Sequence, residues 1–335
     1  MKSAVVEKPG IITVHERGAY RVNGPDDVLV KVSACGICGT DVHIYHGEYM
    51  GSYPMTPGHE FSGVVVEVGE KVTRFSPGAR VTVEPNICCD NCVACLSNRQ
   101  NFCENWQAVG VTRPGAFAQY VLAPEKVVFD VGGIPFEQAA FMEPLSCVLH
   151  GIESVGIRLG ENVAVIGTGP IGMLLLRTAR AWGATRFTVA ELGQERLAAA
   201  RRDGVAEATR DVTSLPSDRF DVVIDATGAP PMLSQAVRLA RPGGRILMFG
   251  VAPQGKTATI EPFQVFRKGL SIFSSYTSRR NSLQALALIG SGRVRVDDLV
   301  SHRMLLEGLE AGIHTIEDRT QNAMKVMVFP NEETL

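Results

Sequence analysis

The sequence lacks the features of a membrane protein or a nucleic-acid-binding protein. Across 335 residues the formal net charge is only −2, which gives no general electrostatic attraction to nucleic acid or to an anionic membrane. No run of about 18 apolar residues occurs, since the best candidate, IGMLLLRTARAW, is interrupted by Arg177 and Arg180. The first residues, MKSAVVEKPGIITVHERG, contain no apolar segment of the kind found in signal peptides. We therefore expect a cytoplasmic protein that binds neither nucleic acid nor membrane.

The composition is that of an ordinary soluble protein. Hydrophobic residues make up 45% of the chain and charged residues 20%, so a large core needs no special support. The length predicts about two domains. The sequence has no internal repeat and no low-complexity linker.

Cysteines are concentrated in one short segment. Five of the eight cysteines lie in CCDNCVACLSNRQNFC, residues 88–103. In a reducing compartment such a cluster favours metal ligands over disulfides. The spacing C-x2-C-x2-C-x7-C suits a zinc ion whose four positions are all taken by protein, which makes the site structural. An iron–sulfur cluster and a metal-free loop are the alternatives. Cys88 breaks the spacing and is left outside the set, although an exchange with Cys89 stays open. The predicted ligands are Cys89, Cys92, Cys95 and Cys103.

A second, mixed set of metal-binding residue types is spread over the first half of the chain. Cys38 lies in SACGICGTDVH, after the strand-like DDVLVKV, and His59 and Glu60 are adjacent in TPGHEFSG. Glu143 follows in FMEPLSC. Three protein ligands of this mixed kind leave a fourth position open, as in catalytic zinc sites. The alternative is a histidine satisfied in the core beside a surface glutamate.

The segment NVAVIGTGPIG, residues 162–172, has the pattern of a dinucleotide-binding loop. A short apolar run leads into three glycines and an apolar-periodic helix, so the pyrophosphate would lie at a helix N-terminus. A second strand, RFTVAEL, ends at Glu191, whose carboxylate favours NAD over NADP, whereas Arg196 could accept a 2′-phosphate. An ordinary glycine turn is the alternative. The predicted cofactor residues are Gly167, Gly169, Pro170, Ile171, Gly172, Glu191 and Arg196.

The order of predicted elements indicates an α/β protein with two domains. After residue 145, strands alternate with helices: RFDVVIDATG is a strand, PMLSQAVRLA a helix, RPGG a turn and RILMFG a strand. This alternation predicts a doubly wound parallel sheet. The preceding region has alternating strand patterns with glycine and proline turns, which predicts a mostly β domain. We expect domains at 1–145, with a cysteine lobe at about 86–105, and at 146–275, followed by a segment at 276–335.

Taken together, these motifs resemble the medium-chain, zinc-dependent alcohol dehydrogenase superfamily over essentially the whole chain. The motifs GIC-G-T-D-x-H, GHE and EP are similar to those of its sorbitol (polyol) and threonine dehydrogenase branch. The resemblance implies a GroES-like catalytic domain, a Rossmann domain, and a segment 276–335 that returns to the catalytic domain. It also implies two zinc ions per chain, one catalytic and one structural, and NAD as cofactor.

The resemblance also implies roles for single residues. Cys38 and His59 match ligands of the catalytic zinc, and Glu60 matches a third or transient ligand. Glu143 stands where the family binds zinc or holds its water. Thr40 matches the residue that takes the substrate proton, and His43 the one that passes it to solvent. Arg196 matches a position near the adenosine ribose.

The expected reaction moves hydride from a secondary alcohol, most simply a polyol, to NAD and gives a ketone. Threonine, a simple secondary alcohol and a sugar-alcohol phosphate are alternative substrates, and a catalytically silent relative or a zinc- or redox-sensing regulator is an alternative class. We expect a homodimer or homotetramer, with RILMFGV as an edge that can pair. Arg279 or Arg280 could meet a phosphate or carboxylate, although a surface arginine is the commoner case. The expected substrate pocket draws on Tyr45, Tyr53, Phe117, Tyr276 and Arg279.

The first prediction concerns Cys38. Replacing it by Ala removes a thiolate ligand, so the variant should lose turnover and the catalytic zinc while keeping its fold. Zinc content per chain, NADH production and circular dichroism check these three outcomes. Full activity in a variant without the catalytic zinc would contradict the mechanism.

Overall fold

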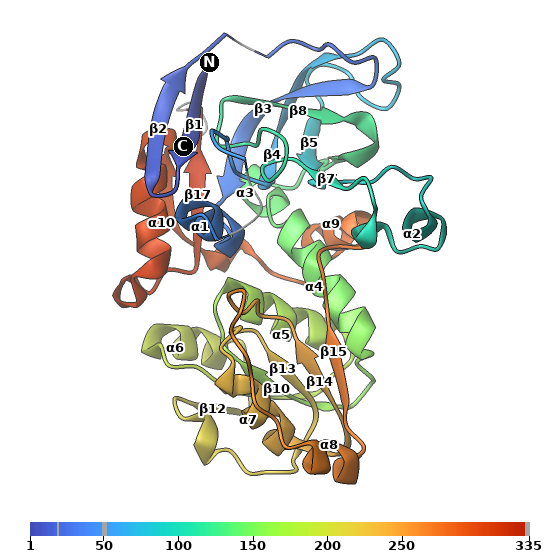
Figure 1. Cartoon of the computed structure of the whole chain (residues 1–335), viewed down its shortest axis with the longest axis vertical. Helices are drawn as coiled ribbons and strands as arrows, with labels where there is room; N and C mark the ends of the chain where they lie inside the picture. The colour runs from blue at the N-terminus through green and yellow to red at the C-terminus, as the bar shows by residue number, and fades with distance from the viewer. Residues whose placement is uncertain (19, 49–51, 332–335) are drawn as a thin grey trace. The chain divides into compact units, whose positions relative to one another are not determined.

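The computed structural model describes residues 1–18, 20–48 and 52–331, which form two compact units (Figure 1). Unit 1 consists of Met1–Ser146 and Ser278–Leu335, and unit 2 of Cys147–Thr277. Each unit has a hydrophobic core of its own. The chain therefore leaves unit 1 once and returns to it.

Unit 1 is built on a seven-stranded sheet. The strand order is β16-β17-β3-β4-β5-β9, and β8 also pairs with β3. The two strands β16 and β17 come from the returning C-terminal part of the chain. Two further two-stranded sheets, β1-β2 and β6-β7, lie outside this sheet. The strands of unit 1 are β1 (Lys2–Lys8), β2 (Ile11–Glu16), β3 (Asp27–Gly36), β4 (Glu60–Val68), β5 (Arg80–Val83), β6 (Asn86–Ile87), β7 (Gln107–Ala108), β8 (Tyr120–Pro124), β9 (Val128–Asp130), β16 (Val300–Leu305) and β17 (Lys325–Phe329).

Helices are short in unit 1, as its mostly β pattern predicts. Helix α4 begins in unit 1 and continues beyond its boundary at Ser146. The helices are α1 (Gly39–His46), α2 (Val93–Leu96), α3 (Phe136–Ala139), α4 (Met142–Val155), α9 (Ser282–Gly290) and α10 (Leu309–Glu317).

Unit 2 contains a six-stranded sheet in which every neighbouring pair is parallel. The order β12-β11-β10-β13-β14-β15 is that of a Rossmann domain, whose ligand binds where the order reverses, beyond the carboxyl ends of the strands. The strands are β10 (Asn162–Ile166), β11 (Arg186–Ala190), β12 (Glu207–Thr209), β13 (Phe220–Asp225), β14 (Ala240–Met248) and β15 (Ser271–Ser274). The helices are α5 (Pro170–Trp182), α6 (Gln194–Arg202), α7 (Pro231–Leu239) and α8 (Pro262–Lys268).

This architecture confirms the predicted fold class and corrects two details. The segment RPGG, predicted as a turn, lies within β14, because Ala240 pairs with Phe220 before the register shifts. Strand β14 is not an edge, since it pairs with β13 and β15. The edge on that side is β15, whose side chains are exposed or half-buried.

Candidate active site and metal centres

Cys38, His59 and Glu60 meet where two neighbouring strands of unit 1 end and begin. In the antiparallel pair β3 and β4, Gly36 lies opposite Glu60. Cys38 lies two residues after the end of β3 and is the N-cap of α1, while His59 directly precedes β4. Ligand atoms from the three side chains all lie within 4.8 Å of one another. Strand register therefore brings together residues about twenty positions apart.

Asp41 contacts the backbone beside both segments that carry the three residues. Its side chain is fully buried, and its carboxylate accepts hydrogen bonds from the backbone N–H of Cys38 (2.8 Å) and of Gly58 (3.2 Å). Its Oδ1 also lies 3.5 Å from Nδ1 of His59. Burial alone would lower the pKa of His59, but the negative charges of Asp41 and Cys38 raise it well above its usual value. The sequence analysis assigned Asp41 no role, although an acid in the first turn of a helix is a capping signal.

Glu60 forms a buried ion pair with Lys325. Their closest atoms, Oε2 and Nζ, are 2.5 Å apart, and the two side chains are only 2% and 4% exposed. Lys325 also donates to the carbonyl of Ile37 at 3.1 Å. Burial would lower the pKa of Lys325, but the charges of Glu60, Cys38 and Glu143 raise it above its usual value. The sequence analysis missed Lys325, which stands 265 residues from its partner.

The three clustered side chains fit a metal ion. Oε1 of Glu60 is buried and has no hydrogen-bond partner among the described residues. A buried carboxylate oxygen without a partner is costly unless a cation or donor meets it. A thiolate, an imidazole and a carboxylate are zinc ligands, and three of them leave a coordination position open. Glu143 is also buried, and its negative charge helps to raise the pKa of Lys325, so it lies in the same region. It does not belong to the group of three residues whose ligand atoms converge.

Helix α1 carries the two predicted proton-relay residues. Thr40 and His43 are three positions apart, so they lie on the same side of the helix, and both are half-buried. Nδ1 of His43 lies 2.8 Å from the carboxylate of Glu48, a residue that the sequence analysis did not consider. In the tautomer whose Nδ1–H donates a hydrogen bond to Glu48, Nε2 is the nitrogen that can accept a proton.

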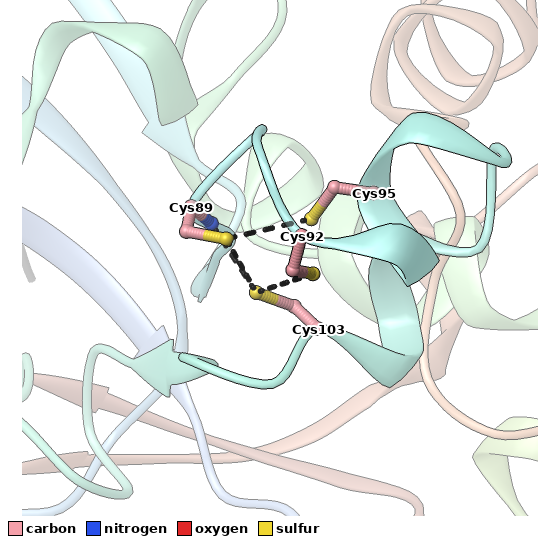
Figure 2. Close-up of side chains that lie close together, drawn as sticks. All are labelled: Cys89, Cys92, Cys95 and Cys103. Atoms are coloured by element: carbon pink, nitrogen blue, oxygen red, sulfur yellow. Dashed lines mark hydrogen bonds between the residues drawn. The ribbon is translucent and has the colours of Figure 1, made fainter.

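The cysteine loop brings four sulfur atoms together, as Figure 2 shows. The sulfur–sulfur distances are 3.5 Å for Cys89–Cys103 and 4.0 Å for both Cys89–Cys95 and Cys92–Cys103. A zinc ion bound tetrahedrally by thiolates at about 2.3 Å would separate them by about 3.8 Å. None of the eight cysteines is in a disulfide. The loop therefore fits a zinc ion that is fully enclosed by protein.

Backbone groups favour the thiolate form of two of these cysteines. The N–H groups of Asn91 and Cys92 lower the pKa of Cys89 to about 6. The pKa of Cys92 is lowered by the N–H groups of Cys95 and Glu104. Burial instead raises the pKa of Cys95 above its usual value.

Cys88 lies outside this group of four. Its thiol donates a hydrogen bond to Oδ1 of Asp90 at 3.1 Å. Burial is the main cause that raises its pKa above the usual value.

In unit 2 the glycine-rich loop joins β10 to α5. Gly167 has φ of +88°, and Gly169 is the N-cap of α5, whose first residue is Pro170. A Cβ on Gly172 would lie 2.0 Å from the carbonyl oxygen of Gly167, so no larger residue fits there. Ile171 is half-buried in the first turn. The N-terminus of α5 is thus free to face a phosphate.

Glu191 and Arg196 flank this loop. The carboxylate of Glu191, directly after β11, accepts hydrogen bonds from the backbone N–H of Thr168 (2.7 Å) and of Gly193 (2.8 Å). A guanidinium nitrogen of Arg196 lies 3.7 Å from the point that a Cβ on Gly169 would occupy. Arg196 therefore reaches the loop itself, where it can face a phosphate.

The residues predicted for the substrate pocket are placed differently from one another. The hydroxyl of Tyr45 donates to Glu310 (2.8 Å) and lies 3.2 Å from the carbonyl of Gly10, and that of Tyr53 donates to the carbonyl of Ile44. Phe117 belongs to the core of unit 1. These three side chains make hydrogen bonds or core contacts within unit 1. Their positions therefore do not support their predicted role in a substrate pocket. Tyr276 and Arg279 are exposed.

Arg280, the other arginine expected to meet a ligand anion, has a partner within the chain. Its guanidinium lies 2.5 Å from Oδ1 of Asp90 in the cysteine loop.

Both halves of the chain match known protein families. Residues 24–133 match the alcohol dehydrogenase GroES-like domain, and residues 170–290 match the family described as zinc-binding dehydrogenase. D-altritol 5-dehydrogenase of Agrobacterium fabrum is 37% identical over 84% of this chain and 86% of its own. The chain belongs to the zinc-dependent alcohol dehydrogenase family.

Other members of the family are similar over nearly the whole chain. Sorbitol dehydrogenase of Bacillus subtilis is 31% identical, over 99% of this chain and 98% of its own. The crystal structure of a zinc-binding dehydrogenase from Sinorhizobium meliloti, bound to NADP, is 37% identical with a TM-score of 0.90, covering 98% of this chain and 99% of that one. Within the described ranges, no helix has both the length and the apolar character needed to cross a bilayer.

The buried ion pair gives a testable prediction. Lys325→Met leaves the carboxylate of Glu60 buried without its cation, so the free energy of unfolding of the metal-free protein should fall by about 3–5 kcal/mol. Adding Glu60→Gln should recover part of this loss, because the unpaired charge is gone. Urea unfolding after treatment with a chelator measures both.

The matched control is Lys2→Met, which breaks the exposed Lys2–Glu307 pair. A change of less than about 1 kcal/mol is expected there. An equal fall in the free energy of unfolding in Lys325→Met and Lys2→Met would show that the buried Lys325–Glu60 pair stabilises the protein no more than an exposed pair does.

Proposed function

We propose that this protein oxidises a secondary hydroxyl group of a polyol to a ketone and transfers the hydride to NAD. The observation that carries the proposal is the convergence of Cys38, His59 and Glu60, with one carboxylate oxygen left unpartnered, in a chain whose relatives include polyol dehydrogenases. D-arabinitol dehydrogenase 1 of Uromyces fabae, 32% identical over 91% of this chain, supports the same substrate class.

The site residues of unit 1 each have a part in the proposed reaction. Cys38, His59 and Glu60 would hold a zinc ion, which would supply Lewis-acid chemistry that lowers the pKa of an alcohol hydroxyl. The hydroxyl of Thr40 would take the alcohol proton while giving up its own, and Nε2 of His43 would pass a proton on to solvent. Glu48 keeps His43 in the tautomer that can accept it, and Asp41 holds the backbone at Cys38 and Gly58 in place.

The proposed cofactor is NAD, bound at the glycine-rich loop of unit 2. The carboxylate of Glu191 lies at the end of β11, where it can accept hydrogen bonds from the ribose hydroxyls and repel a 2′-phosphate. Related structures contain both cofactors: the Sinorhizobium meliloti protein is bound to NADP, and an Escherichia coli protein that is 28% identical is complexed with NADH. Glu191 is the reason for preferring NAD here.

An amino alcohol is the second candidate substrate. L-threonine 3-dehydrogenase of Mesorhizobium japonicum is 33% identical over 91% of this chain, which is close to the value for the polyol enzymes.

The test is an NAD-linked screen of substrates. Polyols should reduce NAD with a kcat/KM at least about tenfold above that for threonine, simple secondary alcohols and sugar-alcohol phosphates, and NAD should be preferred to NADP. NADH absorbance measures each rate. Turnover of threonine alone would establish the second candidate, and a clear preference for NADP would show that Glu191 does not set cofactor choice.

We further propose that the protein is a cytoplasmic homo-oligomer, built through strand β15. None of its eight cysteines is in a disulfide, which suits a reducing compartment. Strand β15 is an exposed edge that carries Ile272, and Phe263 and Phe266 of the nearby α8 are 61% and 81% exposed. An exposed apolar edge strand invites pairing with a second copy. Cell fractionation tests the proposed location.

The assembly proposal predicts that Ile272→Lys yields a monomer, because a charge on the edge strand opposes pairing. Analytical ultracentrifugation distinguishes a monomer from a dimer or tetramer. Leu283→Lys, at an exposed residue of α9 in unit 1, is the control and should keep the wild-type state. An unchanged oligomer in Ile272→Lys would place the interface elsewhere.

A further inference from the structure

The cysteine loop, residues 86–105, contacts a segment almost 200 positions further along the chain. This return segment, Ser278–Ser282, is where the chain re-enters unit 1 after unit 2. Two separate sets of contacts join the loop and its flanks to the segment, and all of them lie within unit 1.

The first contact is an ion pair from inside the loop. Asp90 stands between the ligands Cys89 and Cys92, and its Oδ1 lies 2.5 Å from the guanidinium of Arg280. Its Oδ2 lies 2.8 Å from Nζ of Lys126, which also donates to the carbonyl of Cys88. One carboxylate of the loop therefore holds a cation from the return segment and one from the body of unit 1.

The second contact is a buried hydrogen-bond network at the base of the loop. Glu84 is 7% exposed, and its carboxylate accepts from the side chain of Asn86 (2.6 Å) and from the hydroxyl of Ser282 (3.1 Å). Asn86 also donates to Ser278 at 3.3 Å and accepts from the indole N–H of Trp106 at 2.9 Å. The network thus joins both ends of the loop to both ends of the return segment. Burial raises the pKa of Glu84 above its usual value.

Both partners of the ion pair lie at unusual backbone positions. Asp90 has φ of +62° and Arg280 has φ of +55°, both in the left-handed region that side-chain-bearing residues rarely adopt. Such a conformation is strained for a residue with a side chain and persists only where the surroundings fix it. Both partners of the pair adopt this conformation.

We infer that the cysteine loop anchors the return segment, so that metal binding in the loop and the order of residues 278–282 stabilise each other. Metal binding fixes Asp90, because its loop is closed by ligands on both sides. Asp90 then holds Arg280, and the base of the loop holds Ser278 and Ser282. Coupling of this kind is reciprocal, so weakening the contact must also weaken metal retention. Because no substrate takes part in it, this inference does not depend on the proposed polyol chemistry.

The first experiment measures zinc release into excess chelator from the full-length protein. A Cys38→Ala background limits the signal to the cysteine loop, which should hold one zinc per chain. Arg280→Ala should release that zinc about 2- to 5-fold faster, as expected for a partly exposed ion pair. Glu84→Ala, which leaves buried partners unsatisfied, should release it about tenfold faster. Arg279→Ala removes the neighbouring arginine and should release zinc at the unchanged rate.

The second experiment tests the reverse direction of the coupling by hydrogen exchange. In the wild-type chain and in the Cys38→Ala chain, removing zinc should speed amide exchange in peptides covering residues 276–290. Peptides from β10 in unit 2 serve as the internal reference and should not change. This measurement remains informative if the Cys38→Ala protein folds poorly.

Three results would overturn the inference. One is release of zinc from Arg280→Ala and Glu84→Ala at the same rate as from Arg279→Ala. Another is unchanged exchange at residues 276–290 after zinc removal. The last is a Cys38→Ala protein that folds but contains no zinc, which would show that the loop does not hold the metal at all.

Discussion

The buried ion pair between Lys325 and Glu60 is the contact on which the first unit depends. It joins β17, near the end of the chain, to β4, near the start, inside one sheet. Burying two charges is expensive, and only good geometry and further hydrogen bonds offset that cost. Here the two atoms are 2.5 Å apart and Lys325 has a second acceptor in the carbonyl of Ile37. The candidate active site is therefore completed only when the chain has returned from unit 2.

The two clusters of metal-binding residues differ in what they leave open. In the cysteine loop the four sulfurs lie close together, and the Cys89–Cys103, Cys89–Cys95 and Cys92–Cys103 distances of 3.5–4.0 Å are close to the spacing around one zinc ion. In the other cluster three residues converge, and one oxygen of Glu60 has no partner among the described residues. The segment with more cysteines thus matches a closed site, and the proposed chemistry is assigned to the cluster of three residues.

Sequence reasoning predicted what depends on local pattern. The glycine-rich loop, the alternation of strands and helices and the spacing of four cysteines are each visible within about twenty residues, and the fold class follows from them. Pairing across long distances could not be predicted. Nothing near Lys325 in AMKVMVF indicates a buried cation, and nothing near Arg280 indicates an acidic partner at Asp90. Strand β15 was likewise overlooked, because its four residues carry no alternation that distinguishes an edge. The roles of the site residues stay predictions.

Each of the two groups of metal-binding residues in unit 1 has a cationic side chain from the returning part of the chain beside it. Lys325 pairs with a ligand carboxylate of one cluster, and Arg280 pairs with Asp90 within the other. The environments differ: the first pair is almost completely buried, whereas the side chains of the second are 61% and 42% exposed. A buried pair opposes the separation of its partners strongly, and an exposed pair does so weakly. In the metal-free protein we therefore expect the Lys325–Glu60 pair to hold its site more firmly than the Asp90–Arg280 pair holds the cysteine loop. The more buried of the two pairs thus lies at the cluster that leaves a coordination position open, whereas the more exposed pair lies beside the four cysteines.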